Sequence, residues 1–265
     1  MRAGRLLGAG STANVYEWGA TEVVKIFHDR ESSAGEAAKE ARKARIVDQM
    51  QLRAPRFSGL YEYEGTACLV FERIDGPTVL RCIEPAPASV TFYATLMARL
   101  HVELHHVEAA PALDPDLTLE LARIIRGAEP LAEAERATVL EVLGTLPEGR
   151  SICHYDFHPG NIIMSPRGPV IIDWMNAFVG NPAADVARTS MMIGLAELPP
   201  DAPLWLSDGA YRARFGEEYL AAYSRLSGMA PEDVSEWLAP SLAVRASEVR
   251  GAERRRALNR LRSVV

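Results

Sequence analysis

The stretch HYDFHPGN at residues 154–161, with Asp173 twelve residues beyond it, decides the interpretation of this chain. Short apolar runs border the stretch on both sides. Asp156 in such a loop can accept a proton from a hydroxyl. Asn161 and Asp173 offer hard oxygen atoms of the kind that Mg²⁺ prefers. Taken alone, Pro-Gly-Asn is a common turn, but its pairing with a strand-terminal aspartate indicates a functional site.

Outward from this stretch, the chain divides into a β-rich beginning and a helical remainder. Alternating β-type residues at 14–27 and at 60–71, each around a Gly-containing turn, predict two hairpins. The segment from about Gly35 to Met50 is rich in helix formers at helical spacing and predicts a helix on the sheet. The pair Gly76-Pro77 is the predicted domain boundary. Beyond it we expect a helix with Ser89 as its N-cap, helices near 117–127, 133–146, 211–227 and 232–262, and short strands at 150–155, 162–164 and 170–173.

A glycine-containing loop, GAGSTANV, lies at residues 8–15. Gly8 and Gly10 allow the backbone to lie close to a phosphate, and Ser11 and Thr12 add N–H and O–H donors. Two glycines in a hairpin can equally be a simple turn. The loop is therefore weak evidence for phosphate binding when it is considered alone.

Lys25 is flanked by apolar residues in the first predicted hairpin. A buried ammonium group needs a partner or a ligand, because an unpaired buried charge is strongly destabilising. Glu40 or Glu36 on the following helix can supply the carboxylate. The alternative is a lysine on the solvated face of the strand.

These features, in this order, resemble the aminoglycoside phosphotransferase and choline-kinase-like family, the small-molecule branch of the protein-kinase-like fold. The resemblance extends from the glycine loop through the connector VFERIDG at 70–76 and the loop at 154–161 to Asn181-Pro182-Ala183-Ala184-Asp185. It implies an α+β fold of two lobes. The small β-rich N-terminal lobe is expected at 1–75, and the larger, mostly helical catalytic and acceptor-binding lobe at 76–265.

The resemblance also implies a role for each matching residue and the cofactors ATP and Mg²⁺. Asp156 would orient and deprotonate the acceptor hydroxyl, and His158 would contribute a donor near the transferred phosphate. Asn161 and Asp173 would hold magnesium. The remaining nucleotide contacts would come from Gly8, Gly10, Ser11 and Thr12 over the phosphates, Lys25 paired with Glu40 at the α- and β-phosphates, and the backbone from Glu72 to Ile74 at the adenine.

The sequence departs from the protein-kinase pattern at several of these positions. Ala13 replaces the third glycine, Tyr155 replaces the arginine of H-R-D, Trp174 follows the metal aspartate, and no A-P-E segment is present. These departures favour a small-molecule O-phosphotransferase. A protein or peptide kinase and a nucleotide-binding module without catalysis remain the alternatives.

Other polar residues have simpler interpretations. His101 and His105 have the i, i+4 spacing of some zinc sites, but no third ligand accompanies them in sequence, so we expect packed histidines. Asp185 is expected to tie the loop at 154–161 to the next helix through hydrogen bonds. The arginine-rich segment 244–265 is expected to be a solvated helix face with Glu248 and Glu253 as partners.

Composition limits the partners and the compartment. The chain has 265 residues and a net charge of −6, which gives no general reason to expect nucleic acid or an anionic membrane as a partner. No segment approaches the length of a membrane span, and no obligate protein partner is evident. Three widely spaced cysteines fit reduced thiols, and we expect a cytoplasmic protein.

The acceptor is the least defined part of the prediction. Residues 101–150 hold ten acidic residues against four arginines. Such an excess suits a polyamine such as an aminoglycoside, whose modification would confer antibiotic resistance. Exposed helix faces would produce the same composition. Choline, a sugar, homoserine and other amino alcohols remain open.

Overall fold

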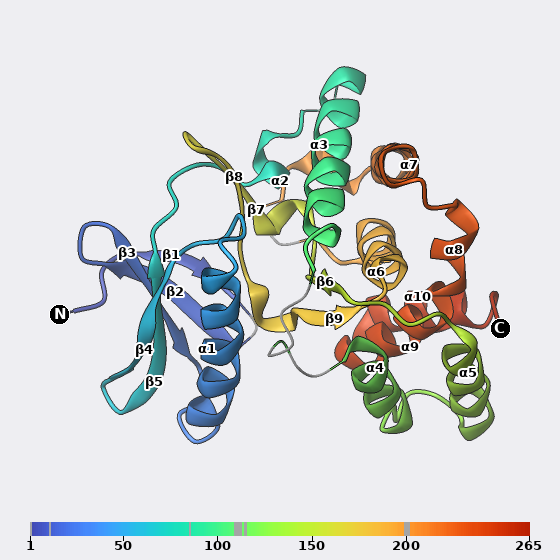
Figure 1. Cartoon of the computed structure of the whole chain (residues 1–265), viewed down its shortest axis with the longest axis horizontal. Helices are drawn as coiled ribbons and strands as arrows, with labels where there is room; N and C mark the ends of the chain where they lie inside the picture. Colours follow the sequence, from blue (N-terminus) through green and yellow to red (C-terminus); the bar gives the residue numbers. More distant parts are fainter. Residues whose placement is uncertain (1, 11, 85, 109–112, 114–115, 199–201) are drawn as a thin grey trace. The chain divides into compact units, whose positions relative to one another are not determined.

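The structure is a computed structural model that describes residues 2–10, 12–84, 86–108, 113, 116–198 and 202–265 (Figure 1). Its contacts group the chain into two compact units. Unit 1 comprises Met1–Thr78 and Asn161–Met175, and unit 2 comprises Val79–Gly160 and Asn176–Val265. Unit 1 therefore contains a segment that the sequence assigned to the C-terminal lobe. No helix among the described residues is long and apolar enough to cross a bilayer.

Unit 1 is built on an antiparallel five-stranded sheet with the order β1-β2-β3-β5-β4. Both predicted hairpins are present, because each pair of β-type runs is joined by a Gly-containing turn. In the first, Val15 pairs with Lys25, and in the second, Tyr63 pairs with Thr66. The strands are β1 (Leu6–Ala9), β2 (Ala13–Trp18), β3 (Glu22–Phe27), β4 (Phe57–Tyr63) and β5 (Thr66–Glu72).

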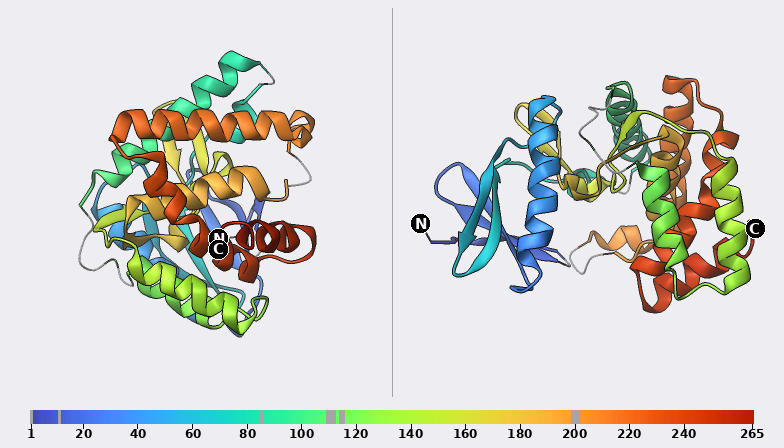
Figure 2. Two further views of the ribbon diagram at one scale, coloured as in Figure 1. Left: turned by 90° about the vertical axis from the view of Figure 1, so that its right-hand side faces the viewer. Right: turned by 60° about the horizontal axis from the view of Figure 1, so that its bottom comes forward.

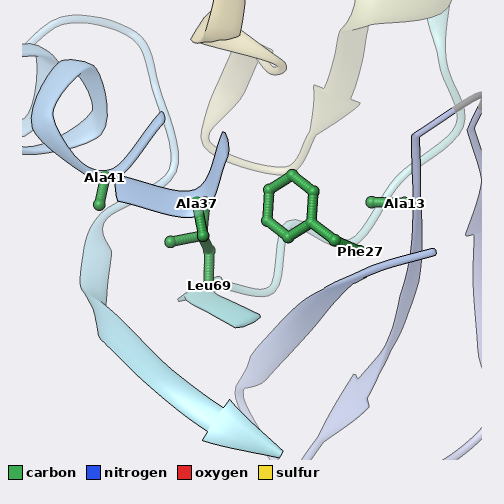
Figure 3. Close-up of a cluster of buried hydrophobic side chains, with 5 residues drawn as sticks. All are labelled: Ala13, Phe27, Ala37, Ala41 and Leu69. Atoms are coloured by element: carbon green, nitrogen blue, oxygen red, sulfur yellow. The ribbon is translucent and has the colours of Figure 1, made fainter. Parts of the chain in front are cut away.

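Helix α1 (Ser33–Gln49) covers one face of this sheet, as its alanine spacing predicts. Ala37 and Ala41 of α1 pack in a buried cluster with Phe27 and Leu69 of the sheet (Figure 3). Ala13 completes the cluster and is 2% exposed. A glycine in its place would remove a buried methyl group, which explains the departure from the three-glycine pattern.

A separate antiparallel hairpin completes unit 1. It consists of β7 (Ile162–Ser165) and β8 (Gly168–Ile171), and it is flanked by short 3₁₀ turns at Pro159–Asn161 and Trp174–Asn176. The Met164 N–H donates to the Pro77 carbonyl at 2.8 Å. The Gly76 backbone has φ +149°, and a Cβ there would collide with the Met164 carbonyl oxygen. Gly76 is thus required by the close approach of the hairpin.

Unit 2 is mostly helical, with one small antiparallel sheet formed by β6 (Ser151–Cys153) and β9 (Phe178–Gly180). The long helices α3 and α7 pack against each other, and α6 also contacts α7 (Figures 1 and 2). Its core contains the fully buried side chains of Trp237, Tyr219 and Phe157. The helices are α2 (Val79–Cys82), α3 (Pro87–His105), α4 (Leu117–Arg126), α5 (Glu133–Thr145), α6 (Pro182–Leu195), α7 (Gly209–Ser227), α8 (Pro231–Glu236), α9 (Leu238–Glu248) and α10 (Gly251–Leu261), with a 3₁₀ turn at Leu204–Ser207.

Two predictions of helix boundaries are wrong. Helix α3 begins at Pro87 rather than after Ser89, whose hydroxyl accepts the Glu84 N–H at 2.9 Å. The segment 232–262 is three helices instead of one. An extended residue at Val249 and a φ of +60° at Gly251 separate the last two helices. The predictions also missed α6, although they expected Asp185 to tie the loop at 154–161 to a following helix.

Candidate functional site

Lys25 lies on β3 of unit 1 between two carboxylates. Its Nζ is 2.8 Å from Glu40 Oε1 and 3.4 Å from Asp173 Oδ1, and its side chain is only 13% exposed. Burial opposes the charge, but the carboxylates of Asp173 and Glu40 outweigh it and raise the pKa of Lys25. The strand lysine is therefore a buried cation with Glu40 as its partner, and the solvated alternative is wrong. Its role toward a nucleotide stays a prediction.

The two predicted magnesium ligands lie in the same unit as Lys25. The Ile172 N–H donates to the Asn161 carbonyl at 2.9 Å, which joins Asn161 to the residue immediately before Asp173. Asp173 has φ +63°, a conformation that is rare for a residue with a side chain, and its side chain is 44% exposed. Its second carboxylate oxygen and the Asn161 amide oxygen have the chemistry of magnesium ligands.

The glycine loop connects β1 and β2 at one edge of the sheet. The Gly10 N–H donates to the Ala13 carbonyl at 2.9 Å, and the His28 N–H donates to the Thr12 carbonyl at 2.9 Å. A Cβ added to Gly8 would meet no atom within 4 Å, so the fold itself does not demand this glycine. Ser11 lies outside the described residues. The phosphate contacts of Gly8, Gly10, Ser11 and Thr12 stay predictions.

The segment from Glu72 to Ile74, predicted to hold adenine, begins at the end of β5. The Glu72 N–H donates to the Arg56 carbonyl at 2.9 Å, and the Arg73 N–H donates to the Thr21 carbonyl at 2.8 Å. Both donors are thus used by the sheet. The Ile74 N–H makes no backbone–backbone hydrogen bond with another described residue. The Glu72 and Ile74 side chains line a groove of about 590 Å³, where Glu72 pairs with Arg167.

Asp156 and His158 lie in unit 2, within residues 154–161, which we call the catalytic loop after the role predicted for Asp156. His158 Nδ1 accepts the Gly160 N–H at 3.1 Å, so its Nε2 carries the proton of the neutral ring. That Nε2 is 3.8 Å from Asp156 Oδ2. The partly exposed Asp156 carboxylate thus faces the His158 Nε2–H, and the Gly160 N–H of the same loop orients the His158 ring.

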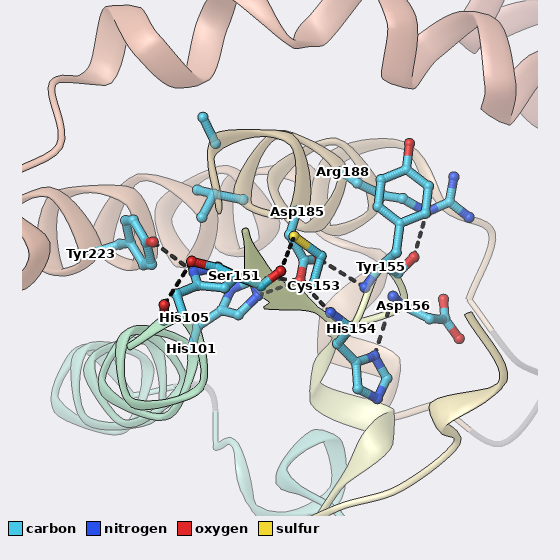
Figure 4. A network of polar contacts seen from close by, with 12 residues as sticks. His101, His105, Ser151, Cys153, His154, Tyr155, Asp156, Asp185, Arg188 and Tyr223 are labelled. Atoms are coloured by element: carbon cyan, nitrogen blue, oxygen red, sulfur yellow. Dashed lines mark hydrogen bonds and ion pairs between the residues drawn. The ribbon is translucent and has the colours of Figure 1, made fainter. Parts of the chain in front are cut away.

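Asp185 of α6 holds the backbone of the catalytic loop, as the sequence predicts. Its Oδ2 accepts the His154 N–H at 2.5 Å, and its Oδ1 accepts the Tyr155 N–H at 2.9 Å (Figure 4). Both residues and Asp185 itself are buried. Two main-chain donors that would otherwise lack a partner are satisfied by one carboxylate.

Two histidines of α3 complete the surroundings of Asp185. His101 Nε2 is 3.0 Å and His105 Nε2 is 3.4 Å from Asp185 Oδ2, while their Nδ1 atoms lie 2.6 and 2.7 Å from the hydroxyls of Tyr219 and Tyr223. Burial and the neighbouring His105 lower the pKa of His101 to about 4. Burial by itself raises the pKa of Asp185, but the histidine side chains outweigh it and hold that pKa below its ordinary value. A neutral His101 therefore lies beside an ionised Asp185, with Nε2 3.0 Å from Oδ2, while its Nδ1 makes the hydrogen bond with the Tyr219 hydroxyl.

The three side chains form the one group among the described residues with the composition of a metal site. The sequence had indicated that His101 and His105 lack a third ligand, and the structure corrects this by placing Asp185 beside them. The contacts of 3.0 and 3.4 Å are hydrogen-bond distances rather than the 2.0–2.2 Å of zinc bonds. The histidines are buried packing residues, and each bonds a tyrosine hydroxyl through Nδ1, although His101 Nε2 makes no hydrogen bond of good geometry among the described residues.

A family model described as the phosphotransferase enzyme family matches residues 4–237. The chain belongs to this family. It is a small-molecule phosphotransferase with an alcohol group as acceptor, as the sequence predicted. No curated protein matches it in sequence.

Solved structures share the fold of this phosphotransferase. Aminoglycoside-3′-phosphotransferase of type VIII has 19% identity and a TM-score of 0.62, with 91% of each chain covered. The streptomycin–ATP complex of APH(2″)-IIa has 14% identity and a TM-score of 0.60, with 98% of this chain and 90% of that chain covered. Amicoumacin kinase hAmiN, in complex with AMP-PNP, Ca²⁺ and Ami, has 13% identity and a TM-score of 0.61, with 98% and 86% covered. The α+β protein-kinase-like fold is confirmed.

The sequence missed one charged residue that touches the catalytic loop of this phosphotransferase. Arg188 follows Asp185 by three residues, so both lie on one face of α6. The i, i+3 spacing from Asp185 is the signal in the sequence, but it identifies Arg188 only when residues 182–195 are known to be helical.

The acidic residues of segment 101–150 are not all available to a cationic acceptor. Glu120 pairs with Arg123 at 2.5 Å, Glu135 pairs with Arg262 at 2.7 Å, and Asp116 caps α4 through the Leu119 N–H. Several of the carboxylates thus serve helix ends and ion pairs, which supports the interpretation as ordinary helix faces. Asp114 lies outside the described residues.

Proposed function

We propose that this phosphotransferase transfers the γ-phosphate of ATP, with Mg²⁺, to a hydroxyl of a small cationic molecule such as an aminoglycoside or another amino alcohol. The observation that carries the proposal is the position of Lys25 between Glu40 and Asp173, with Asn161 bonded through its backbone to the residue before Asp173. A phosphate-binding cation and two oxygen ligands are thereby gathered in one folded unit. Phosphoryl transfer requires this kind of positioning and charge neutralisation.

The nucleotide would be held by residues of unit 1. Lys25 binds the α- and β-phosphates, and Gly8, Gly10, Ser11 and Thr12 cover the phosphates. The Ile74 N–H, which is not used by the sheet, donates to the adenine ring. Related structures contain ATP, AMP-PNP or ADP, according to their descriptions.

Asn161 and Asp173 would hold the magnesium ion, and their oxygen donors fit that ion. When bound, the ion neutralises phosphate charge. Lys25 already faces Asp173 Oδ1, so a cation near this carboxylate is compatible with the local charge. Removal of the metal with EDTA should abolish turnover. Asp173→Ala should also weaken the Mg²⁺ dependence of the thermal shift that ATP produces, a readout that does not require turnover.

Asp156 would accept the proton of the acceptor hydroxyl as the phosphate is transferred, and the His158 Nε2–H would donate to the phosphate oxygens. The 3.8 Å separation of the two side chains allows both to address one substrate region. A general base typically contributes about 10²–10⁴-fold in rate. Asp156→Asn should therefore lower kcat at least about a hundredfold while ATP binding is retained.

The acceptor class is supported by the related proteins, whose structures are described with streptomycin, gentamicin and kanamycin. The three free cysteines, Cys68, Cys82 and Cys153, fit a cytoplasmic location, where ATP is abundant. If the acceptor is an aminoglycoside antibiotic, a strain that expresses the chain should tolerate a higher concentration of it.

The deciding experiment couples ADP release to a panel of acceptors, namely aminoglycosides, choline, homoserine and sugars, with wild type, Asp156→Asn and Asp208→Asn. Asp208 caps α7 at the surface and serves as the matched control. Turnover with at least one acceptor that Asp156→Asn loses and Asp208→Asn keeps supports the proposal. Equal turnover by wild type and Asp156→Asn would refute the assignment of the base.

A further inference from the structure

Arg188 is a buried cation in direct contact with the catalytic loop. It lies on α6, is 2% exposed, and donates from Nε to the Tyr155 carbonyl at 2.7 Å. Its guanidinium carbon is 4.5 Å from the centroid of the Tyr155 ring. Figure 4 shows the side chain beside Tyr155, the residue immediately before Asp156. No step of the proposed reaction uses Arg188.

The charge of Arg188 is balanced by Glu248 at the end of α9. Arg188 Nη2 is 3.0 Å from Glu248 Oε1 and 2.8 Å from Oε2. Arg245 Nη1 is 3.4 Å from Glu248 Oε2, and Arg245 Nη2 is 2.5 Å from Glu253 Oε1. Glu253 belongs to α10 and is buried. Positive and negative groups thus alternate across α6, α9 and α10. The arginine-rich segment is therefore more than the solvated helix face that the sequence predicted, although Glu248 and Glu253 are its partners as expected.

This arrangement keeps Arg188 ionised. Burial opposes its charge, but the Glu248 carboxylate outweighs it and raises the pKa of Arg188. A guanidinium group is also suited to this position because its planar fork can donate in several directions at once. One donor holds a main-chain carbonyl while another holds a carboxylate.

The residue that Arg188 holds has an unusual backbone conformation. Tyr155 has φ +59°, a strained conformation for a residue with a side chain, which persists only where the surroundings hold it. Asp185 binds its N–H at 2.9 Å, and Arg188 binds its carbonyl. One face of α6 therefore holds both polar groups of the residue that sets the direction of Asp156.

We propose that Arg188 is a positioning residue for Asp156, and that the Arg188–Glu248 pair keeps the catalytic loop ordered without a phosphorylation event. The proposal rests on the proposed role of Asp156. In kinases that are switched by phosphorylation, a new phosphate pairs with an arginine to order a loop. Here Tyr155 occupies the position of the loop arginine, and a carboxylate of the same chain supplies the anion. The Arg188–Glu248 contact requires no modification of the chain, and it depends on α9, which carries Glu248.

The test compares Arg188→Met, Glu248→Gln and the double variant with wild type in steady-state kinetics and urea unfolding. Arg212→Met is the matched control, because Arg212 is another arginine of unit 2 that holds main-chain carbonyls, those of Ile193 and Ala196. Those carbonyls lie at the C-terminal end of α6, away from the catalytic loop. We expect Arg188→Met to lower kcat about 10- to 100-fold, with KM for ATP changed less than about twofold, since small misplacements of reacting groups have effects of this size.

The double variant separates positioning from stability. Arg188→Met leaves Glu248 without its buried partner, and the additional Glu248→Gln removes that charge, so the double variant should regain part of the lost stability. If kcat stays low in the double variant, and Arg212→Met lowers stability without lowering kcat, the positioning role is supported. If kcat recovers together with stability, or if Arg188→Met turns over like wild type, the proposal is wrong.

Amide hydrogen exchange gives a readout that does not depend on the acceptor. Peptides that span residues 153–157 should exchange faster in Arg188→Met than in wild type or Arg212→Met. Equal exchange in all three proteins would overturn the proposal. A wild type without turnover on any acceptor would instead count against the proposed function and leave this measurement decisive for Arg188.

Discussion

Replacement of Asp185 by alanine gives the most direct test of the network below the catalytic loop. The carboxylate accepts two main-chain N–H groups, those of His154 at 2.5 Å and Tyr155 at 2.9 Å, and all three residues are buried. Each buried donor left without a partner costs about 1–3 kcal/mol. The two main-chain donors together therefore account for about 2–6 kcal/mol. We expect Asp185→Ala to lower the free energy of unfolding by about 4 kcal/mol.

The assay is urea unfolding at pH 7, followed by tryptophan fluorescence, with Asp208→Ala measured in parallel. Asp208 also accepts a main-chain N–H, that of Ala210 at 2.9 Å, but it is an exposed helix cap. Loss of an exposed cap costs about 1 kcal/mol, because water replaces the acceptor. Asp185→Asn should fall between the two alanine variants, since its amide retains an acceptor but turns an N–H₂ group toward donors. If Asp185→Ala costs no more than Asp208→Ala, burial does not amplify these bonds and the reasoning fails.

Three other predictions can be checked by unfolding measurements. Burial lowers the pKa of His101 from 6.5 to about 4, so the unfolded chain takes up a proton in that range that the folded chain excludes. The free energy of unfolding should therefore have its full value above pH 6.5 and fall by up to about 3 kcal/mol between pH 6.5 and 4. A free energy of unfolding that stays constant over that range in urea titrations would contradict this. Gly76→Ala should cost at least about 2 kcal/mol because of its positive φ and the Met164 carbonyl, whereas Gly144→Ala, in the last turn of α5 where a Cβ meets nothing within 4 Å, should gain up to about 1 kcal/mol; similar melting temperatures for the two variants would argue against the close approach. Arg262→Ala should leave the urea midpoint nearly unchanged, because Arg262 is exposed to solvent and its ion pair with Glu135 is screened by water, and a clear loss of stability would show that this pair is not an ordinary surface contact.

Local features of unit 1 could be predicted from sequence because they depend on neighbouring elements. Lys25 and Glu40 lie on consecutive elements, a strand and the helix that packs on it, so their pairing follows from the hairpin–helix order. The second partner of Lys25 was not predicted. Asp173 is 148 residues away, and periodicity does not indicate that the hairpin at 162–171 returns to the first sheet.

The support of the catalytic loop was harder to predict. Asp185 was correctly placed by its position after the loop, but Glu248 is 60 residues from Arg188, and their contact depends on the breaks that divide segment 232–262 into three helices. The sequence predicts that segment as one helix because its composition is helical throughout. An extended Val249 and the positive φ of Gly251 change the direction of the chain, and composition does not reveal this.

The return of residues 161–175 to unit 1 has a consequence for synthesis on the ribosome. The Pro77 carbonyl and the Arg53 carbonyl accept N–H groups from Met164 and Ile171, which are made much later than the sheet. At about 5–20 residues per second, roughly 4–17 s separate the synthesis of Thr78 from that of Asn161. During that interval the nascent sheet and α1 lack the hairpin that completes their unit. Ribosome-bound chains that end before the hairpin should be more sensitive to protease, and to capture by chaperones, than chains long enough to expose residue 175.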